Sequence, residues 1–214
     1  MNNFERKFGK FSITNLTAYI IIGRVFFLIL SYISPETLEL FTLDIEAIMH
    51  GQVWRILTYM FIPNSNLFWF FFEVMFLYWI GTGLEQEWGS FRYTLYMLGS
   101  VLGVGLASVI LYFMPGQDLM LVTLGGYLIS SFFTYTLFLP FAWYYGEEEI
   151  RFMLMITIKV KYLGIIDLVL LIMTLANAYS IGGLGLLMVL LFSMVNMIVF
   201  FAVVFARRGK QKAR

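Results

Sequence analysis

The sequence contains no cysteine and only one histidine, His50, among its 214 residues. The absence of cysteine excludes disulfides, thiolate nucleophiles and cysteine-ligated metal sites. The single histidine excludes any mechanism that needs two imidazoles. We therefore expect neither a bound metal nor a cofactor.

Charged residues are scarce as well. They make up 13% of the chain, whereas a soluble domain carries about 25%. Hydrophobic residues make up 61%, so most of the protein surface cannot face water. The net charge is +1, which gives no long-range field that would attract nucleic acid. The lipid bilayer is the partner that this composition predicts.

Apolar runs of about 20 residues recur along the chain, and a helix of that length crosses the hydrocarbon core of a bilayer. The sequence predicts an all-α, polytopic membrane protein, one domain over residues 1–214, with six helices. The predicted helices cover residues 16–33, 67–84, 91–114, 119–141, 162–178 and 181–206. Residues 34–66 form a long external loop, interrupted by charges but apolar enough to lie in the membrane interface. Residues 151–161 are compatible with a short strand, an interfacial helix or an early start of helix five.

Basic residues set the expected orientation, because lysine and arginine concentrate on the cytoplasmic side of membrane proteins. With the N-terminus inside, all of the 14 lysines and arginines except Arg24 and Arg55 fall on the inside. Six helices also place both termini on the same side. We expect a multi-pass protein with both termini cytoplasmic, in the plasma (inner) membrane if the source is bacterial.

Three charged residues fall within the predicted helices: Arg24 in helix one, Glu73 in helix two and Asp167 in helix five. A charge near the middle of a membrane helix costs about 2.5–3.5 kcal/mol on insertion scales. Arg24 and Glu73 lie at similar depth, so we expect them to form a pair or to share a water-filled cavity, the alternative being separate polar partners. Asp167 lies about two turns from the inner end, where water can reach it.

Small residues are expected to mark close helix contacts, because they let the backbones of two membrane helices approach. On helix three they recur every four residues. The candidates on the three helices are Gly99, Gly103, Ala107, Gly125, Gly126, Gly182 and Gly183. No strand precedes these glycines, which makes them poor candidates for a phosphate-binding loop.

The segment Gly51–Tyr59, with Trp54 and Arg55, resembles the tryptophan-arginine motif in the first external loop of the rhomboid superfamily. The end of the second predicted helix, with Leu84 and Glu85, is similar to the corresponding rhomboid helix. Residues 159–163 resemble the lysine-bearing start of the fifth helix in Derlin-type relatives. The resemblance covers roughly residues 10–205 and implies a rhomboid-like six-helix bundle.

The resemblance fails at the catalytic positions. A rhomboid protease uses a serine on helix four and a histidine on helix six, and these positions read Leu128 and Ser180. The histidine and asparagine of helix two, which help to hold the oxyanion, read Trp69 and Glu73. Serine is a weak nucleophile without a base, and helices four to six contain no histidine. The sequence therefore predicts a Derlin-like pseudoprotease without catalytic residues.

By resemblance, such a protein would bind transmembrane segments of client proteins for quality control or trafficking, without cleaving them. Two alternatives remain open. The first is an intramembrane serine protease with a non-standard site, in which Ser130 or Ser131 would be the nucleophile. The second is a small transporter that reuses the fold, with Arg24, Glu73 and Asp167 along a polar path.

Overall fold

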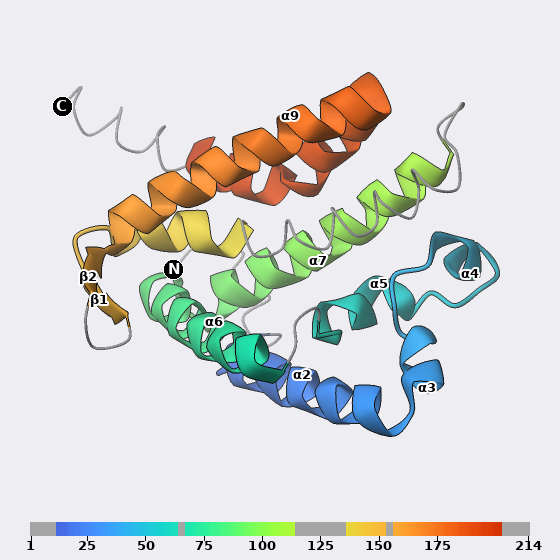
Figure 1. Cartoon of the computed structure of the whole chain (residues 1–214), viewed down its shortest axis with the longest axis horizontal. Coiled ribbons are helices and arrows are strands. Elements are labelled where there is room, and N and C mark those ends of the chain that lie inside the picture. The colour runs from blue at the N-terminus through green and yellow to red at the C-terminus, as the bar shows by residue number, and fades with distance from the viewer. Residues whose placement is uncertain (1–11, 64–66, 114–135, 153–155, 203–214) are drawn as a thin grey trace. The chain divides into compact units, whose positions relative to one another are not determined.

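The computed structural model describes residues 12–63, 67–113, 136–152 and 156–202 (Figure 1). The chain divides into two compact units, Met1–Gly105 and Leu106–Arg214, and each is described by itself. The described residues are mostly helical. Three of their helices are long and apolar enough to cross a membrane, with candidate spans at Leu16–Ile33, Leu67–Trp88 and Val160–Asn177.

The first unit begins with helix α2, Leu16–Ile33, whose bounds are those predicted. Asn15 precedes it in the left-handed conformation, which asparagine tolerates better than most residues. The helix ends at Ser34, because Pro35 disfavours helical geometry in the residue before it and Ser34 is extended, with φ −148° and ψ 82°.

Four short helices make up most of the predicted external loop, residues 34–66: α3 Pro35–Glu39, α4 Ile45–Met49, α5 Arg55–Thr58 and the 3₁₀ helix η2 Tyr59–Phe61. None is long enough to cross a bilayer, as the charges in this segment predicted. Asp44 caps α4 by accepting a hydrogen bond from the backbone N–H of Ala47 at 3.1 Å. Figure 1 shows α3, α4 and α5 on the side toward which the C-terminal end of α2 points.

Helix α6, Leu67–Trp88, lies beside α2 and continues four residues beyond the predicted end at residue 84. The helix continues through Gly81, Thr82 and Gly83 to Trp88. The Thr82 hydroxyl donates to the carbonyl of Tyr78 at 2.6 Å, so this polar side chain is satisfied by its own helix. The helix ends instead at Gly89, whose φ of +80° is a conformation that glycine adopts without strain.

Helix α7, Ser90–Tyr112, corresponds to predicted helix three. It begins in the first unit and ends in the second. Most of predicted helix four lies outside the described residues, but residues 136–144 are helical and extend three residues past the predicted end.

The second unit contains a feature that an all-α prediction lacks. Strands β1, Glu149–Phe152, and β2, Ile156–Lys159, pair antiparallel, with Glu149 opposite Lys159 and Ile150 opposite Ile158. Of the three possibilities kept open for residues 151–161, the short strand is the one observed. The hairpin leads directly into helix α9 at Val160.

Helix α9 covers Val160–Ser193 and so includes the predicted boundary between helices five and six near residue 180. The hydroxyls of Thr174 and Ser180 donate to the carbonyls of Leu170 and Asn177, both at 2.8 Å, which satisfies them within the helix. The helical pattern breaks at Met194 instead and resumes over residues 195–202.

Candidate functional site

The two central charges of the first unit form an ion pair. Arg24 Nη2 on α2 donates to Glu73 Oε1 on α6. The side chain of Arg24 is 8% exposed and that of Glu73 is 32% exposed, so the arginine is enclosed and the carboxylate reaches the edge of the contact. The pair expected from depth alone is therefore present.

Apolar residues surround the arginine on its own helix. Ile20 and Phe27, one turn to either side of Arg24, are buried on the same face of α2. The buried Arg24 Nε has no hydrogen-bond partner among the described residues. Glu73 is therefore the charge that compensates this guanidinium, and removing one member of such a pair is far costlier than removing both.

Trp54 and Arg55 connect the segments that precede and include α5. Arg55 is buried, and its Nη1 donates to the carbonyls of Glu39 at 2.6 Å and Thr42 at 3.0 Å. Its Nε donates to the Gln52 side chain at 2.7 Å. Trp54 Nε1 donates to the Leu40 carbonyl at 3.2 Å. Both motif residues thus fix the turn that follows α3, which is a structural function.

Glu85 joins three helices at the opposite end of α6. Its Oε1 accepts from the backbone N–H of Asn15 at 2.9 Å, just before α2, and from the Ser90 hydroxyl at 2.7 Å, at the start of α7. One carboxylate thus satisfies groups at the ends of two other helices. Its role in the motif is structural as well.

The first unit contains a close glycine contact, at Gly81, that the sequence did not predict. Of the predicted small residues, Gly99 and Gly103 are half-buried and Ala107 is buried. The tightest contact is at Gly81, where an added Cβ would lie 2.6 Å from Tyr93 Oη and nearer still to Thr17 Oγ1. The two hydroxyls are 2.7 Å apart and hydrogen-bonded. Two hydroxyl residues so far apart in the sequence gave no local signal of this cluster.

Three of the positions that the rhomboid resemblance assigns to a protease site lie within the described residues: Ser180, Trp69 and Glu73. Ser180 is exposed and donates to its own helix, Trp69 is exposed, and Glu73 is in the ion pair. The one histidine, His50, is exposed at the end of α4, where its Nδ1 lies 2.8 Å from the Glu46 carbonyl. Leu128, Ser130, Ser131, Gly125 and Gly126 lie outside the described residues. Gly182 and Gly183 belong to α9.

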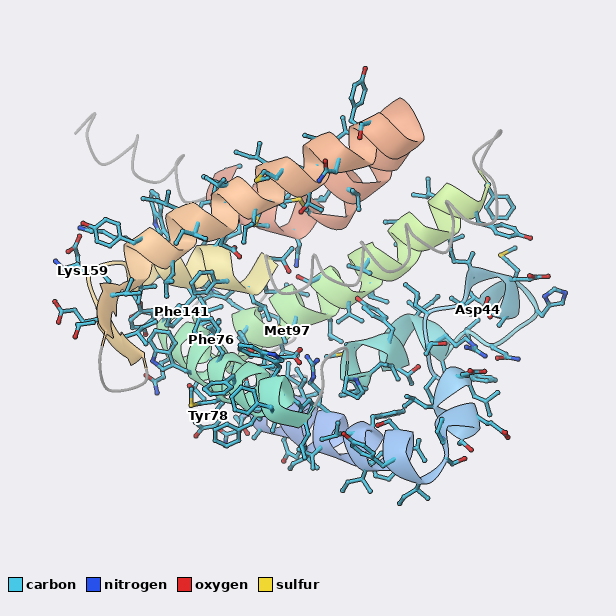
Figure 2. All side chains as sticks on the ribbon, in the orientation of Figure 1. Asp44, Phe76, Tyr78, Met97, Phe141 and Lys159 are labelled. Carbon is cyan, nitrogen blue, oxygen red and sulfur yellow. The ribbon has the colours of Figure 1, made fainter. Side chains whose placement is uncertain are left out.

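Helix α6 presents an aromatic face away from its packed side. Phe68, Phe71, Met75 and Tyr78 are all exposed, and their spacing of three and four residues places them on one face of the helix. We call these four residues the α6 stripe; Figure 2 shows Tyr78 projecting from α6. Phe72 stands beside it, with its ring 5.2 Å from that of Phe68 and 5.8 Å from that of Phe71.

An ion-paired cluster lies at the hairpin of the second unit. Glu147 accepts from Lys159 Nζ at 3.0 Å and from Lys161 Nζ at 2.7 Å. The hydrogen bonds and charges of these lysines lower the pKa of Glu147, and Glu147 in turn raises the pKa of Lys159. All three side chains are well exposed, and Figure 2 places Lys159 at the base of the hairpin. The cluster holds the hairpin at the start of α9.

Asp167 is the third predicted charge. It lies in the apolar segment of α9, and its Oδ2 is buried with no hydrogen-bond partner among the described residues. The sequence predicted that water can reach Asp167, whereas this oxygen is buried in the structure. Within the same described residues, no group of three or more histidine, aspartate and glutamate side chains is placed to hold a metal ion.

A family model described as Eukaryotic integral membrane protein (DUF1751) matches residues 16–206, which is nearly the whole chain. No curated protein and no solved structure matches the chain significantly. The match agrees with the apolar helices in placing the protein in a membrane that it crosses more than once. The description also names eukaryotes, so a bacterial inner membrane, expected only for a bacterial source, is not supported.

Proposed function

The chain belongs to the eukaryotic integral membrane protein family DUF1751, and we propose that it is a rhomboid-like pseudoprotease that binds transmembrane segments of client proteins without cleaving them. Its role would be membrane protein quality control or trafficking, with both termini in the cytoplasm. Three features of the chain support this proposal: the ion pair between Glu73 and Arg24, the position of the single histidine, and the α6 stripe.

The ion pair of Glu73 is the observation that carries the non-catalytic part. By resemblance, this position would hold an asparagine whose amide donates to the oxyanion. An ionised carboxylate has no proton to donate, and it would repel the negative charge that develops on the oxyanion. Glu73 instead accepts a hydrogen bond from the buried Arg24, so its carboxylate is engaged in an ion pair. The site therefore works against the transition state of peptide hydrolysis.

The lack of a base supports the same conclusion. A serine nucleophile needs a neighbouring group to take its proton. The one histidine of the sequence lies in the external loop, exposed, at the end of α4. By resemblance, Ser180 stands at the position of the catalytic histidine of rhomboid proteases. Its hydroxyl donates a hydrogen bond to the Asn177 carbonyl of its own helix. A non-standard protease would need a base from elsewhere.

The α6 stripe supports the binding part. Without water in the bilayer core, helices associate through shape and dispersion contacts rather than by the hydrophobic effect. Phe68 and Phe71 provide large, stiff surfaces, since each ring has few rotamers and is braced by Phe72. By resemblance, helix two borders the lateral entrance through which transmembrane segments approach. A client helix that packs against Phe71 and Tyr78 is the binding mode we propose.

Site-specific photocrosslinking in native membranes tests the proposal. A photoreactive amino acid at Phe71 or Tyr78 is expected to form crosslinks to intact membrane proteins. The matched control is the same amino acid at Ile22 or Ile29, which are exposed on α2. Crosslinks that are equal at the α2 and α6 positions would show only random lipid-phase encounters and would contradict the proposal.

The alternatives have their own outcomes. Labelling of Ser130 or Ser131 by a fluorophosphonate probe would support a protease instead. Flux of a solute into liposomes that is abolished by Glu73→Gln would support a transporter.

A further inference from the structure

The β1–β2 hairpin of the second unit has one polar and one apolar face. Successive residues of a strand point to opposite sides of a sheet. Glu149 lies opposite Lys159 in the register, and Thr157 shares their side, where Glu149 and Thr157 are exposed. Ile150 lies opposite Ile158 on the other side, and we call these two residues the isoleucine pair. Both are half-buried, so the protein covers the isoleucine pair only in part.

The hairpin is held at the start of a candidate membrane span. Strand β2 ends one residue before Val160, where both α9 and the span Val160–Asn177 begin. The backbone N–H of Val160 donates to the Glu148 carbonyl at 2.9 Å, and that of Lys161 donates to the Gly146 carbonyl at 3.0 Å. The hairpin therefore cannot leave the end of α9 without breaking these hydrogen bonds.

The residues on both sides of the hairpin are typical of a membrane interface. Tyr144, just before the hairpin, and Tyr162, in the first turn of α9, are exposed, and tyrosine gathers where hydrocarbon meets water. Lys161 Nζ lies 5.6 Å from the centre of the Tyr162 ring. The start of α9 is therefore at the depth of the lipid headgroups.

The direction of the strands keeps the hairpin close to that depth. The headgroup layer of one leaflet is about 5–8 Å thick. A strand of four residues is about 13 Å long, so a hairpin that continued the axis of α9 would pass through the layer. Figure 1 shows β1 and β2 turned aside from the axis of α9 instead.

The charges beside the hairpin indicate which lipid it meets. Glu147 accepts from both lysines at the start of α9. Glu148 and Glu149 are exposed and add negative charge, so the described side chains of residues 145–162 carry no surplus of positive charge. Anionic lipids attract segments that have such a surplus. The isoleucine pair, rather than the lysines, is the feature that favours a lipid surface.

We propose that the hairpin is a membrane-surface contact, with the isoleucine pair in the headgroup layer of the bilayer that α9 crosses and the Glu149 side turned to water. Its partner is a zwitterionic lipid surface. The contact sets the depth of the first turn of α9, and it does not depend on client binding.

Single-cysteine labelling tests this contact, because the chain has no cysteine of its own. Ile158→Cys and, in a second variant, Ile150→Cys carry an environment-sensitive fluorophore in the full chain, reconstituted into phosphatidylcholine vesicles. Thr157→Cys is the matched control, since it is the adjacent residue of β2 on the polar face. A lipid with a nitroxide on its headgroup should quench both isoleucine labels about twofold more than the control, because the headgroup layer is only about 5–8 Å thick. Iodide in the water should quench the control more.

The remaining outcomes are equally decisive. Equal quenching of Ile158→Cys and Thr157→Cys by iodide, without an effect of the nitroxide lipid, would overturn the proposal. Isoleucine labels that neither reagent quenches would show that protein covers the pair, which also overturns it. Adding phosphatidylserine should leave the quenching of the labels unchanged, and a requirement for this lipid would contradict the zwitterionic surface. Glu147→Gln, which frees both lysines, should introduce a dependence on phosphatidylserine.

Discussion

Removing the charge of Glu73 should destabilise the protein, because it leaves a buried cation without its counter-ion. Glu73→Gln keeps the size of the side chain but removes the carboxylate that Arg24 Nη2 contacts. Breaking a buried pair from one side costs about 3–5 kcal/mol. The lower end applies here, about 3 kcal/mol, because the Glu73 side chain is 32% exposed and solvent can replace part of the interaction.

The double replacement should be much less harmful than the single one. Arg24→Met together with Glu73→Leu removes both charges and fills the space with apolar atoms, so no ion is left unpaired. We expect its free energy of unfolding to lie within about 1 kcal/mol of the wild-type value, since apolar replacements of buried pairs are often neutral. The two sites should therefore be strongly non-additive, with a coupling of about 2 kcal/mol or more.

Reversible unfolding in mixed micelles, followed by far-UV circular dichroism as SDS is increased, measures these free energies. Glu36→Gln is the matched control, because Glu36 is exposed at the start of α3 and should change stability by less than about 0.5 kcal/mol. A Glu73→Gln variant as stable as this control would refute the reasoning. So would additive effects of Arg24→Met and Glu73→Leu, each measured alone and then together.

Three further predictions concern the supports of the site. Arg55→Lys removes the Nε donor to Gln52 and shortens the side chain that binds the Glu39 and Thr42 carbonyls, so the free energy of unfolding should fall by about 1–3 kcal/mol. Amide exchange of residues 34–63 should accelerate, and unchanged exchange would contradict this. Gly81→Ala should disturb the Thr17–Tyr93 hydrogen bond and destabilise the protein by about 1–3 kcal/mol in the same SDS titration, whereas a variant as stable as wild type would show that the contact relaxes easily. The pKa of Glu147 is lowered in the folded protein, so its ion pairs stabilise the hairpin at neutral pH, and this contribution is lost as the pH falls through the folded pKa; amide exchange in the hairpin should increase over that acidic range in wild type and not in Glu147→Gln.

Composition and run length predicted the membrane character and the first helix well. A run of apolar residues followed by Ser34-Pro35 fixes both the length and the end of α2. Similar depth in two helices was also enough to suggest the Arg24–Glu73 pair. These features are local, or depend only on position along a membrane helix.

The ends of other helices could not be predicted, because polar residues do not by themselves stop a helix. Thr82 and Ser180 each donate to a carbonyl one turn earlier, so these polar side chains are satisfied within α6 and α9. The Gly81 contact with Thr17 and Tyr93 depends on tertiary packing. A short strand was one of three possibilities for residues 151–161, since a loosely alternating segment fits several structures, and its pairing into a hairpin was not predicted.

The central claim is that this chain holds a transmembrane client and does not cut it. The most direct measurement is intact mass spectrometry of the complex recovered after crosslinking at Tyr78 and incubation in liposomes. The account predicts a client of full length, with no fragment ending within its transmembrane segment. A fragment cut within that segment, absent when Ser130 and Ser131 are replaced by alanine, would contradict it.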